Sequence, residues 1–177
     1  MKKFISLFAL CLFGFAAHAQ MFSYGPVAGV GASTYAYDGG TASPQLSYQV
    51  GGFARFKLAF LYVQPEILFQ SLSSKETDLD LVLTHNRFDV PVNVGWKFLM
   101  FDVNTGPMLS IPLTAKLDDL DVKEQYVGAY LSWQLGAGVE LGPIHVGARY
   151  SYGIQDVIED SDKTRWHNLF AHIEYQF

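Results

Sequence analysis

Eight segments of the chain alternate apolar residues with polar or small ones, and this period of two constrains the fold more than any other feature. The segments span residues 24–34, 46–57, 60–71, 86–98, 100–113, 125–140, 143–155 and 165–177. Successive side chains of a strand point to opposite faces, so each segment predicts a strand with two chemically different faces. Each is also long enough to cross a bilayer as a tilted strand, which takes about 9 to 11 residues.

The connections between these segments alternate in length. The long connections are polar and span residues 35–45, 72–85, 114–124 and 156–164. The tight ones lie at residues 58–59, 99 and 141–142. Such alternation is typical of bacterial outer-membrane barrels, whose short turns face the periplasm and whose long loops face outward. The sequence therefore predicts an all-β fold, an eight-stranded antiparallel up-and-down transmembrane β-barrel.

The first 19 residues have the features of a secretory signal peptide. Two lysines precede an apolar run of about fourteen residues, and Ala17-His18-Ala19 has the small-x-small form at which a signal peptidase cuts. The run is too short to cross a bilayer as a helix, which needs about 20 residues. We expect residues 1–19 to be a signal peptide, residues 20–177 to form one barrel domain, and the outer membrane to be its location.

Charge and cysteine content limit the partners and the chemistry. Without Lys2 and Lys3 the chain keeps 10 of its 12 basic residues against 17 acidic ones, a net charge of −7 with neutral histidines. This balance argues against a nucleic-acid partner, because phosphate backbones are bound by lysine and arginine. The only cysteine, Cys11, lies in the leader, so we expect neither disulfides nor thiol chemistry in the barrel.

No cofactor or metal site is predicted. No two histidines stand at a ligand spacing with a cysteine or a third histidine nearby. The acidic string 118–121 lacks the glycine-centred spacing of a known calcium loop. His145 and His172 share a face with the charged residues of their segments, so we interpret them as members of a polar network rather than as ligands.

Charged residues inside the alternating segments indicate which face points inward. They lie opposite large aliphatic and aromatic residues, whose bulk exceeds what eight strands can enclose. The apolar face is therefore predicted to contact lipid and the charged face to line the lumen. Buried charges persist only when paired, so we expect a polar network to fill the lumen, which argues against a diffusion pore. The predicted members of this network are Arg55, Glu66, Asp89, Arg149, His172 and Glu174.

The last segment carries Tyr175 and Phe177 on its apolar face and ends on an aromatic residue. This ending resembles the C-terminal signal that the outer-membrane assembly machinery reads. We therefore expect the barrel-assembly machinery and outer-membrane lipid as partners, while the partner of the loops stays open.

Several strings of the sequence resemble the PorT-like, OmpA-type outer-membrane β-barrel proteins. They are the glycine-rich stretch 25–34, the stretches 51–56 and 62–69, and residues 88–92. The string Gln64-Pro65-Glu66-Ile67-Leu68-Phe69 carries the resemblance most strongly. The resemblance implies the barrel fold more firmly than any activity. PorT itself is linked to protein secretion, a role that does not follow from the fold alone.

For function, we expect a non-enzymatic protein that acts through its outer loops or supports the envelope or secretion. Two alternatives stay open, a lipid-modifying barrel enzyme and a small-solute channel. The enzyme would need a nucleophile, a base and an orienting acid that converge near the outer rim. Rim residues of suitable type are Ser73, Ser74, His85, Asp156, Ser161, Asp162 and His167.

Overall fold

The computed structural model describes residues 21–37, 40–41, 43–75, 82–117, 120–121, 128–154 and 165–177. Within these ranges, eight long and two very short strands form a single sheet. The long strands are β1 (Phe22–Tyr37), β3 (Ser43–Leu58), β4 (Leu61–Lys75), β5 (Val82–Phe98), β6 (Phe101–Leu117), β8 (Tyr130–Leu141), β9 (Ile144–Gly153) and β10 (Arg165–Tyr175). The short strands are β2 (Gly40–Thr41) and β7 (Leu120–Asp121). Among the residues described, no helix is long and apolar enough to cross a membrane.

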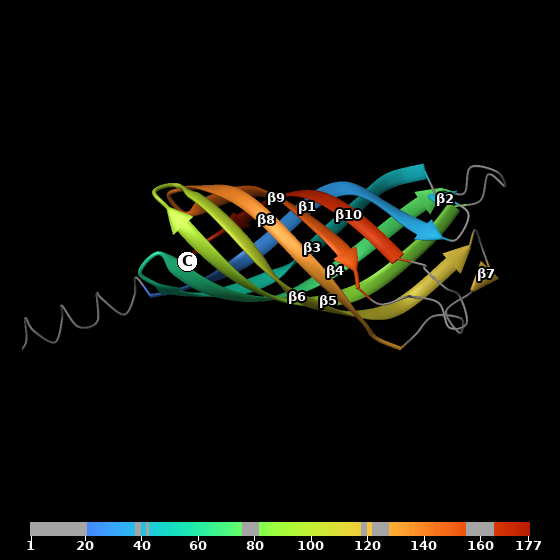
Figure 1. Ribbon diagram of the computed structural model, residues 1–177, viewed down its shortest axis with the longest axis horizontal. Helices are drawn as coiled ribbons and strands as arrows, with labels where there is room; N and C mark the ends of the chain where they lie inside the picture. Colours follow the sequence, from blue (N-terminus) through green and yellow to red (C-terminus); the bar gives the residue numbers. More distant parts are fainter. Residues whose placement is uncertain are drawn as a thin grey trace, which may run out of the picture.

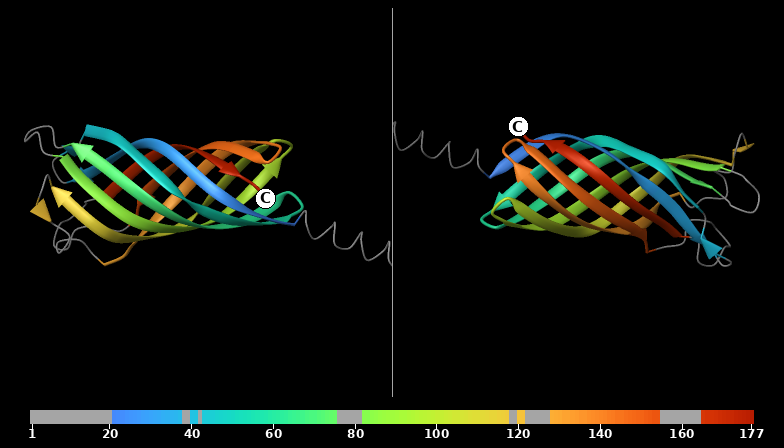
Figure 2. Two further views of the ribbon diagram at one scale, coloured as in Figure 1. Left: turned by 180° about the vertical axis from the view of Figure 1, so that it is seen from behind. Right: turned by 90° about the horizontal axis from the view of Figure 1, so that it is seen from above.

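The sheet closes on itself. Each long strand pairs antiparallel with the long strands next to it in the chain, and β1 also pairs with β10, in register from Val27↔Glu174 to Ala36↔Arg165. The result is an elongated barrel of tilted strands, with the C-terminus at one end and β2 and β7 at the other (Figures 1 and 2). Closure removes the unpaired strand edges that an open sheet would expose to lipid. The eight-stranded up-and-down barrel predicted from the sequence is confirmed.

The end of the barrel that holds the C-terminus has tight turns, and we call it the turn end; the opposite end is the loop end. Two residues make each turn, at 59–60, 99–100 and 142–143. The first residue of each turn has a positive φ, which is 54° at Ala59, 56° at Leu99 and 65° at Gly142. Two-residue hairpins use such angles because they match the twist of the flanking strands.

The outer wall of the barrel is apolar and its lumen is polar. Outward side chains such as Val30 and Ile67 are exposed by 60% and 64%, whereas the inward Arg55 and Asp89 are exposed by 2% and 0%. A continuous apolar wall of this kind is favourable against hydrocarbon, because large apolar surfaces are rarely left exposed to water. The predicted facing of the strands is therefore confirmed.

The height of the apolar wall fits a bilayer. On β5 the outward Phe88 and Phe98 are ten residues apart. At about 3.3 Å per residue and a strand tilt of about 40°, this spacing covers about 25 Å along the barrel axis. Outer-membrane barrels present an apolar band of about that height between two aromatic girdles.

Several strands extend further toward the loop end than the sequence predicted. β4 continues to Lys75 and β5 begins at Val82, because backbone pairing needs no apolar face and goes on beyond the wall that contacts lipid. The sixth strand was predicted to begin at residue 125, but residues 128 and 129 are not part of a strand. Strand β8 begins at Tyr130, the first described residue of that segment with a buried inward side chain. Residues 125–127 and the predicted signal peptide, 1–19, lie outside the described residues.

Candidate functional site

Inward polar side chains from seven of the eight long strands, all but β1, form two groups in the lumen. The group nearer the turns, here called the turn-side network, consists of Arg55, Tyr62, Gln64, Glu66, Asn93, Asp102, His145, Arg149, His172 and Glu174. The group nearer the loops, here called the loop-side cluster, consists of Gln70, Arg87, Asp89 and Tyr130. An apolar cluster of Val27, Phe53 and Leu68 lies between them, and along β4 Leu68 separates Glu66 from Gln70.

Glu174 on β10 is the centre of the turn-side network. One of its carboxylate oxygens accepts a hydrogen bond of 2.8 Å from Arg55 Nη2. The other accepts bonds of 3.1 Å from Arg149 Nη2 and from Gln64 Nε2. The Glu174 side chain is only 1% exposed, so these donors replace the water that a carboxylate otherwise holds. The contacts join β3, β4 and β9 to β10 through the lumen.

Glu66 on β4 is the second acid of the network. Arg149 Nη1 donates to it at 2.7 Å, and the amide groups of Gln64 and Asn93 each donate at 3.0 Å. Arg149 therefore reaches across the lumen from β9 and holds Glu66 and Glu174 with different nitrogens. The planar guanidinium carries several N–H donors in fixed directions, so one arginine can bind two carboxylates at once.

His145, Asp102 and Tyr62 form a third part of the network. The Asp102 carboxylate lies 2.6 Å from His145 Nε2 and accepts a 2.7 Å hydrogen bond from Tyr62 Oη. Because a carboxylate only accepts, the His145 proton is on Nε2, and a neutral ring keeps a lone pair on Nδ1. The Arg55 guanidinium lies 4.6 Å from the centre of the Tyr62 ring, within range of a cation–π contact.

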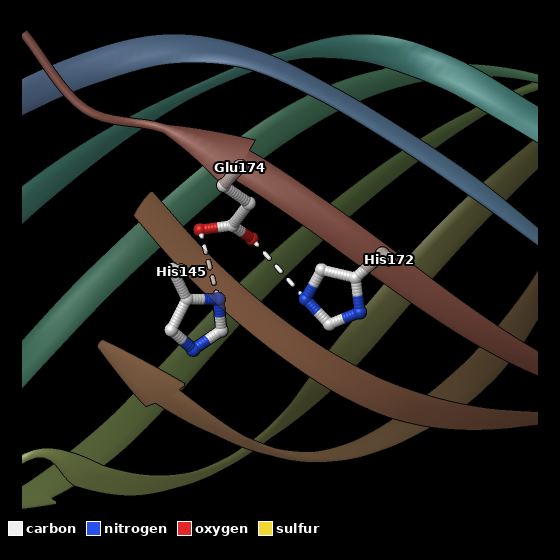
Figure 3. A group of neighbouring side chains, drawn as sticks. All are labelled: His145, His172 and Glu174. Atoms are coloured by element: carbon white, nitrogen blue, oxygen red, sulfur yellow. Dashed lines mark ion pairs between the residues drawn. The ribbon is translucent and has the colours of Figure 1, made fainter. Parts of the chain in front are cut away.

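His172 stands beside His145, with ring centroids 5.5 Å apart. Its Nδ1 accepts a 3.3 Å hydrogen bond from Arg149 Nε, and its Nε2 lies 3.5 Å from a Glu174 oxygen. In Figure 3 the two imidazoles lie on either side of the Glu174 carboxylate, and each directs one nitrogen toward it.

Two glycines make room for these imidazoles. Gly138 and Gly147 pair with each other on β8 and β9. A Cβ at Gly138 would lie 2.3 Å from His145 Nε2, and a Cβ at Gly147 would lie 2.7 Å from His172 Cε1. Each of these glycines therefore leaves the space that an imidazole from the next strand occupies.

A further ionic cluster around Glu140 lies at the turn-end mouth of the lumen. Lys97 Nζ lies 2.6 Å from its carboxylate, Arg55 Nη1 lies 3.4 Å away and Lys57 Nζ 3.8 Å away. The two lysines are 25% and 30% exposed, so these contacts lie at the border with solvent. With the mouth included, four cationic side chains (Arg55, Lys57, Lys97 and Arg149) face four carboxylates (Glu66, Asp102, Glu140 and Glu174). This balance is what allows so many charges to remain inside a barrel.

The loop-side cluster is built around a single ion pair. Arg87 Nε lies 2.9 Å from the Asp89 carboxylate, and both side chains have no exposed surface. The two other guanidinium nitrogens donate to Tyr130 Oη at 2.6 Å and to Gln70 Oε1 at 3.2 Å. Every arm of this buried guanidinium is thus bonded to protein.

The structure brings together five of the six predicted lumen residues and sets one apart. Arg55, Glu66, Arg149, His172 and Glu174 lie in the turn-side network. Asp89 instead pairs with Arg87 in the loop-side cluster. Arg87 was missed, although it stands two residues before Asp89 on the same face of β5, a spacing that could have revealed it. The neutral members of the network, Tyr62, Gln64 and Asn93, were missed because uncharged polar side chains have no charge whose sign would predict a partner.

Tyr175 and Phe177 lie on the outer wall at the turn end, exposed by 44% and 66%. Their rings are 4.9 Å apart, and the Phe177 backbone N–H donates to the Tyr24 carbonyl at 2.9 Å. These contacts attach the final residues to β1. Their recognition by an assembly machinery stays a prediction.

The outer-rim residues considered for catalysis point in different directions in the part of the chain that the structure describes. His85 points into the lumen with no exposed surface, whereas His167 faces outward and bonds Tyr150 Oη through Nδ1 at 2.8 Å. Ser73 pairs with Thr84, the residue before His85. Its side chain is therefore on the outer face of the wall, opposite to the face from which His85 points into the lumen. The side chains of Ser74, Asp156, Ser161 and Asp162 lie outside the described residues.

Solved structures of small barrels resemble this architecture. Neisserial surface protein A is 16% identical, with a TM-score of 0.57 over 88% of this chain and 97% of that one. The chain has the fold of small outer-membrane barrels. Ail, the attachment invasion locus protein of Yersinia pestis, solved in complex with the heparin analogue sucrose octasulfate, is 11% identical, with a TM-score of 0.56 over 88% of this chain and 99% of Ail. Identities this low relate the folds and not the functions. No protein-family model and no curated protein matches the sequence.

Proposed function

We propose that the protein is a non-enzymatic outer-membrane barrel that acts through its loop end, or that supports the envelope or protein secretion. The observation that carries this proposal is the filled lumen, in which Arg55, Asp89 and Glu174 are all at most 2% exposed. An eight-stranded barrel is just wide enough for side chains to fill it. We expect a barrel filled in this way to act mainly through its outer wall and its loops.

Further support comes from the sequence and the fold together. The leader predicted at residues 1–19 directs export, and Tyr175 and Phe177 suit recognition by the barrel-assembly machinery. The apolar wall suits a location in outer-membrane lipid. The stretches that resemble PorT-like proteins support the barrel fold, while a secretion-supporting role and the partner of the loops stay open.

Planar-bilayer recording tests the filled lumen. The refolded protein is expected to insert without steady conductance. A variant with Arg55, Glu66, Arg149 and Glu174 all changed to serine removes the side chains that span the turn-side network, and is expected to conduct if it folds. Steady conductance of the unmodified protein would revive the small-solute channel and contradict the proposal.

Lipid analysis tests the enzyme alternative. His85→Ala and His167→Ala remove the two rim histidines that could act as a catalytic base. Mass spectrometry of outer-membrane lipids is expected to give the same species with and without the protein, and with either variant. A lipid species that depends on the protein and disappears in one variant would establish the enzyme instead.

A further inference from the structure

His145, His172 and Glu174 place three metal-ligating groups around one point of the lumen (Figure 3). One donor atom of each lies within 4.8 Å of the other two, and all three side chains are buried. Glu174 Oε2 lies 3.5 Å from His145 Nδ1, and the other carboxylate oxygen, Oε1, lies 3.5 Å from His172 Nε2. Ligands about 2.1 Å from a tetrahedral metal ion are about 3.4 Å from one another. We propose that this cluster binds a divalent transition-metal ion such as Zn²⁺.

The two imidazole nitrogens that face the centre have no other hydrogen-bond partner. His145 Nδ1 and His172 Nε2 are both buried, and their distance of 3.5 Å from Glu174 is too long for a good hydrogen bond. Buried polar atoms in proteins are nearly always satisfied, so unsatisfied atoms aimed at one point indicate a ligand there. A metal ion at this point would satisfy both.

Asp102 prepares His145 for this role. It accepts the Nε2 proton at 2.6 Å, which leaves the Nδ1 lone pair directed at the centre. Ligating histidines commonly donate their other N–H to a carboxylate, which fixes the ring and raises its basicity. Gly138 and Gly147 add to the preparation, since any side chain there would displace the two rings.

Glu174 has the capacity for one more contact. Arg55, Arg149 and Gln64 occupy three of the roughly four lone-pair positions of its carboxylate. The oxygen that binds Arg55 accepts one protein hydrogen bond and is the one that lies 3.5 Å from His145 Nδ1. It can therefore ligate a metal while the ionic contacts of Glu174 are kept.

His172 must rearrange its protons to bind. Its Nδ1 accepts from Arg149 Nε at 3.3 Å, so the proton of a neutral ring is on Nε2, facing the site. Metal binding moves that proton to Nδ1 and turns Arg149 Nε away. The shorter bonds of Arg149 to Glu66 and Glu174, at 2.7 and 3.1 Å, use other nitrogens and are kept.

The ligand set selects the class of ion. Two imidazoles and one carboxylate suit Zn²⁺, Co²⁺, Ni²⁺ or Cu²⁺, whereas Mg²⁺ and Ca²⁺ prefer oxygen ligands alone. The nearby guanidiniums of Arg55 and Arg149 repel a cation, so the site is weaker than a structural zinc centre. Access is from the turn end, because His145 is the second residue of β9 and lies beside the partly exposed Glu140 cluster.

Metal titration of the refolded chain tests the proposal. The whole chain, without an affinity tag and with His18→Gln to remove the leader histidine, is titrated in detergent micelles with Co²⁺, whose visible absorption reports its coordination. One equivalent of Co²⁺ is expected to bind, to be displaced by Zn²⁺ and to resist Mg²⁺. His145→Gln and His172→Gln are each expected to weaken binding at least about tenfold. His167→Gln, on the outer wall, is the matched control and should bind as the parent chain does.

Absence of saturable Co²⁺ binding would overturn the proposal, as would unchanged affinity in both lumen variants or equal competition by Mg²⁺. If the lumen variants fail to fold, the chain with its barrel histidines intact decides the question by NMR. Bound Co²⁺ is expected to broaden the amide signals of Gly138 and Gly147 most. Broadening centred instead on His85 or His167 would place the ion elsewhere and refute the site.

Discussion

The two halves of the lumen are filled by different kinds of contact. In the turn-side network, Glu174 and Arg149 each bind partners from several strands, so the contacts cross the lumen and hold opposite walls together. The loop-side cluster depends on Arg87 and Asp89, an ion pair formed within β5 alone. A pair within one strand neutralises its own charges but adds little to the connection between walls.

This difference follows from the layout of the barrel. At the turn end, two-residue hairpins hold neighbouring strands in fixed register, so long side chains can be matched across the lumen. At the loop end, the strands lead into long connections. There Arg87 donates hydrogen bonds to Tyr130 and Gln70 in addition to its ion pair with Asp89. We therefore expect the ionic contribution to stability to be concentrated at the turn end.

The largest effect is expected at Glu174. Glu174→Gln keeps the shape of the side chain but removes the charge that Arg55 and Arg149 share. Breaking a buried ion pair costs about 3–5 kcal/mol, and with two pairs affected we expect the free energy of unfolding to fall by about 5 kcal/mol. Urea unfolding in lipid vesicles, followed by tryptophan fluorescence, measures it. Glu140→Gln at the mouth is the control, and an equal loss there would refute the central role of Glu174.

A second test asks whether the loop-side pair is self-contained. Arg87→Met leaves Asp89 buried without its partner, so we expect a loss of about 3 kcal/mol in the same measurement. The double change Arg87→Met with Asp89→Leu should recover most of it. The matched double change Arg149→Met with Glu174→Leu should not recover, because Arg55 and Glu66 keep their charges. Equal recovery in the two halves would remove the contrast between them.

A smaller effect is expected at the glycines beside the imidazoles. Gly138→Ala places a Cβ 2.3 Å from His145 Nε2, so the ring must move away from Asp102. Overpacking of this kind costs about 1–3 kcal/mol. Gly128→Ala is the control, since a Cβ there has no atom within 4 Å and should change stability by less than about 0.5 kcal/mol. Similar effects at the two glycines would show that the turn-side network tolerates rearrangement.

The smallest effect concerns the turns that fix the register of the turn end. Ala59 has a φ of 54°, a conformation that costs a non-glycine residue about 1 kcal/mol. Ala59→Gly should therefore raise the free energy of unfolding by up to about 1 kcal/mol. The same change at Ala137, on the outer face of β8, should lower it by about 0.5–1 kcal/mol, because glycine loses more backbone freedom in a strand. Losses of equal size at both positions would contradict the turn geometry.

Much of the fold could be predicted because it depends on local patterns. The alternation in 143–155 was enough to put Val146 on the outer wall and Arg149 in the lumen, where the structure has them. Strand ends at the loop side were less predictable, as at Lys75 and Val82, since backbone pairing there goes on without an apolar face. Polarity marks where lipid ends, and the hydrogen-bond ladder does not stop at that point.

The sequence by itself determined the number of long strands, the face that each presents to lipid and the inward direction of charges such as Arg55 and Glu174. Only the tertiary structure decided which of those charges meet. Asp89 and Glu66 both point inward on neighbouring strands, yet the register pairs Asp89 with Leu68, one step nearer the loop end than Glu66. The physical reason is the stagger of tilted strands: the depth of a side chain in the lumen is set by the register of the whole closed sheet, which no single segment encodes.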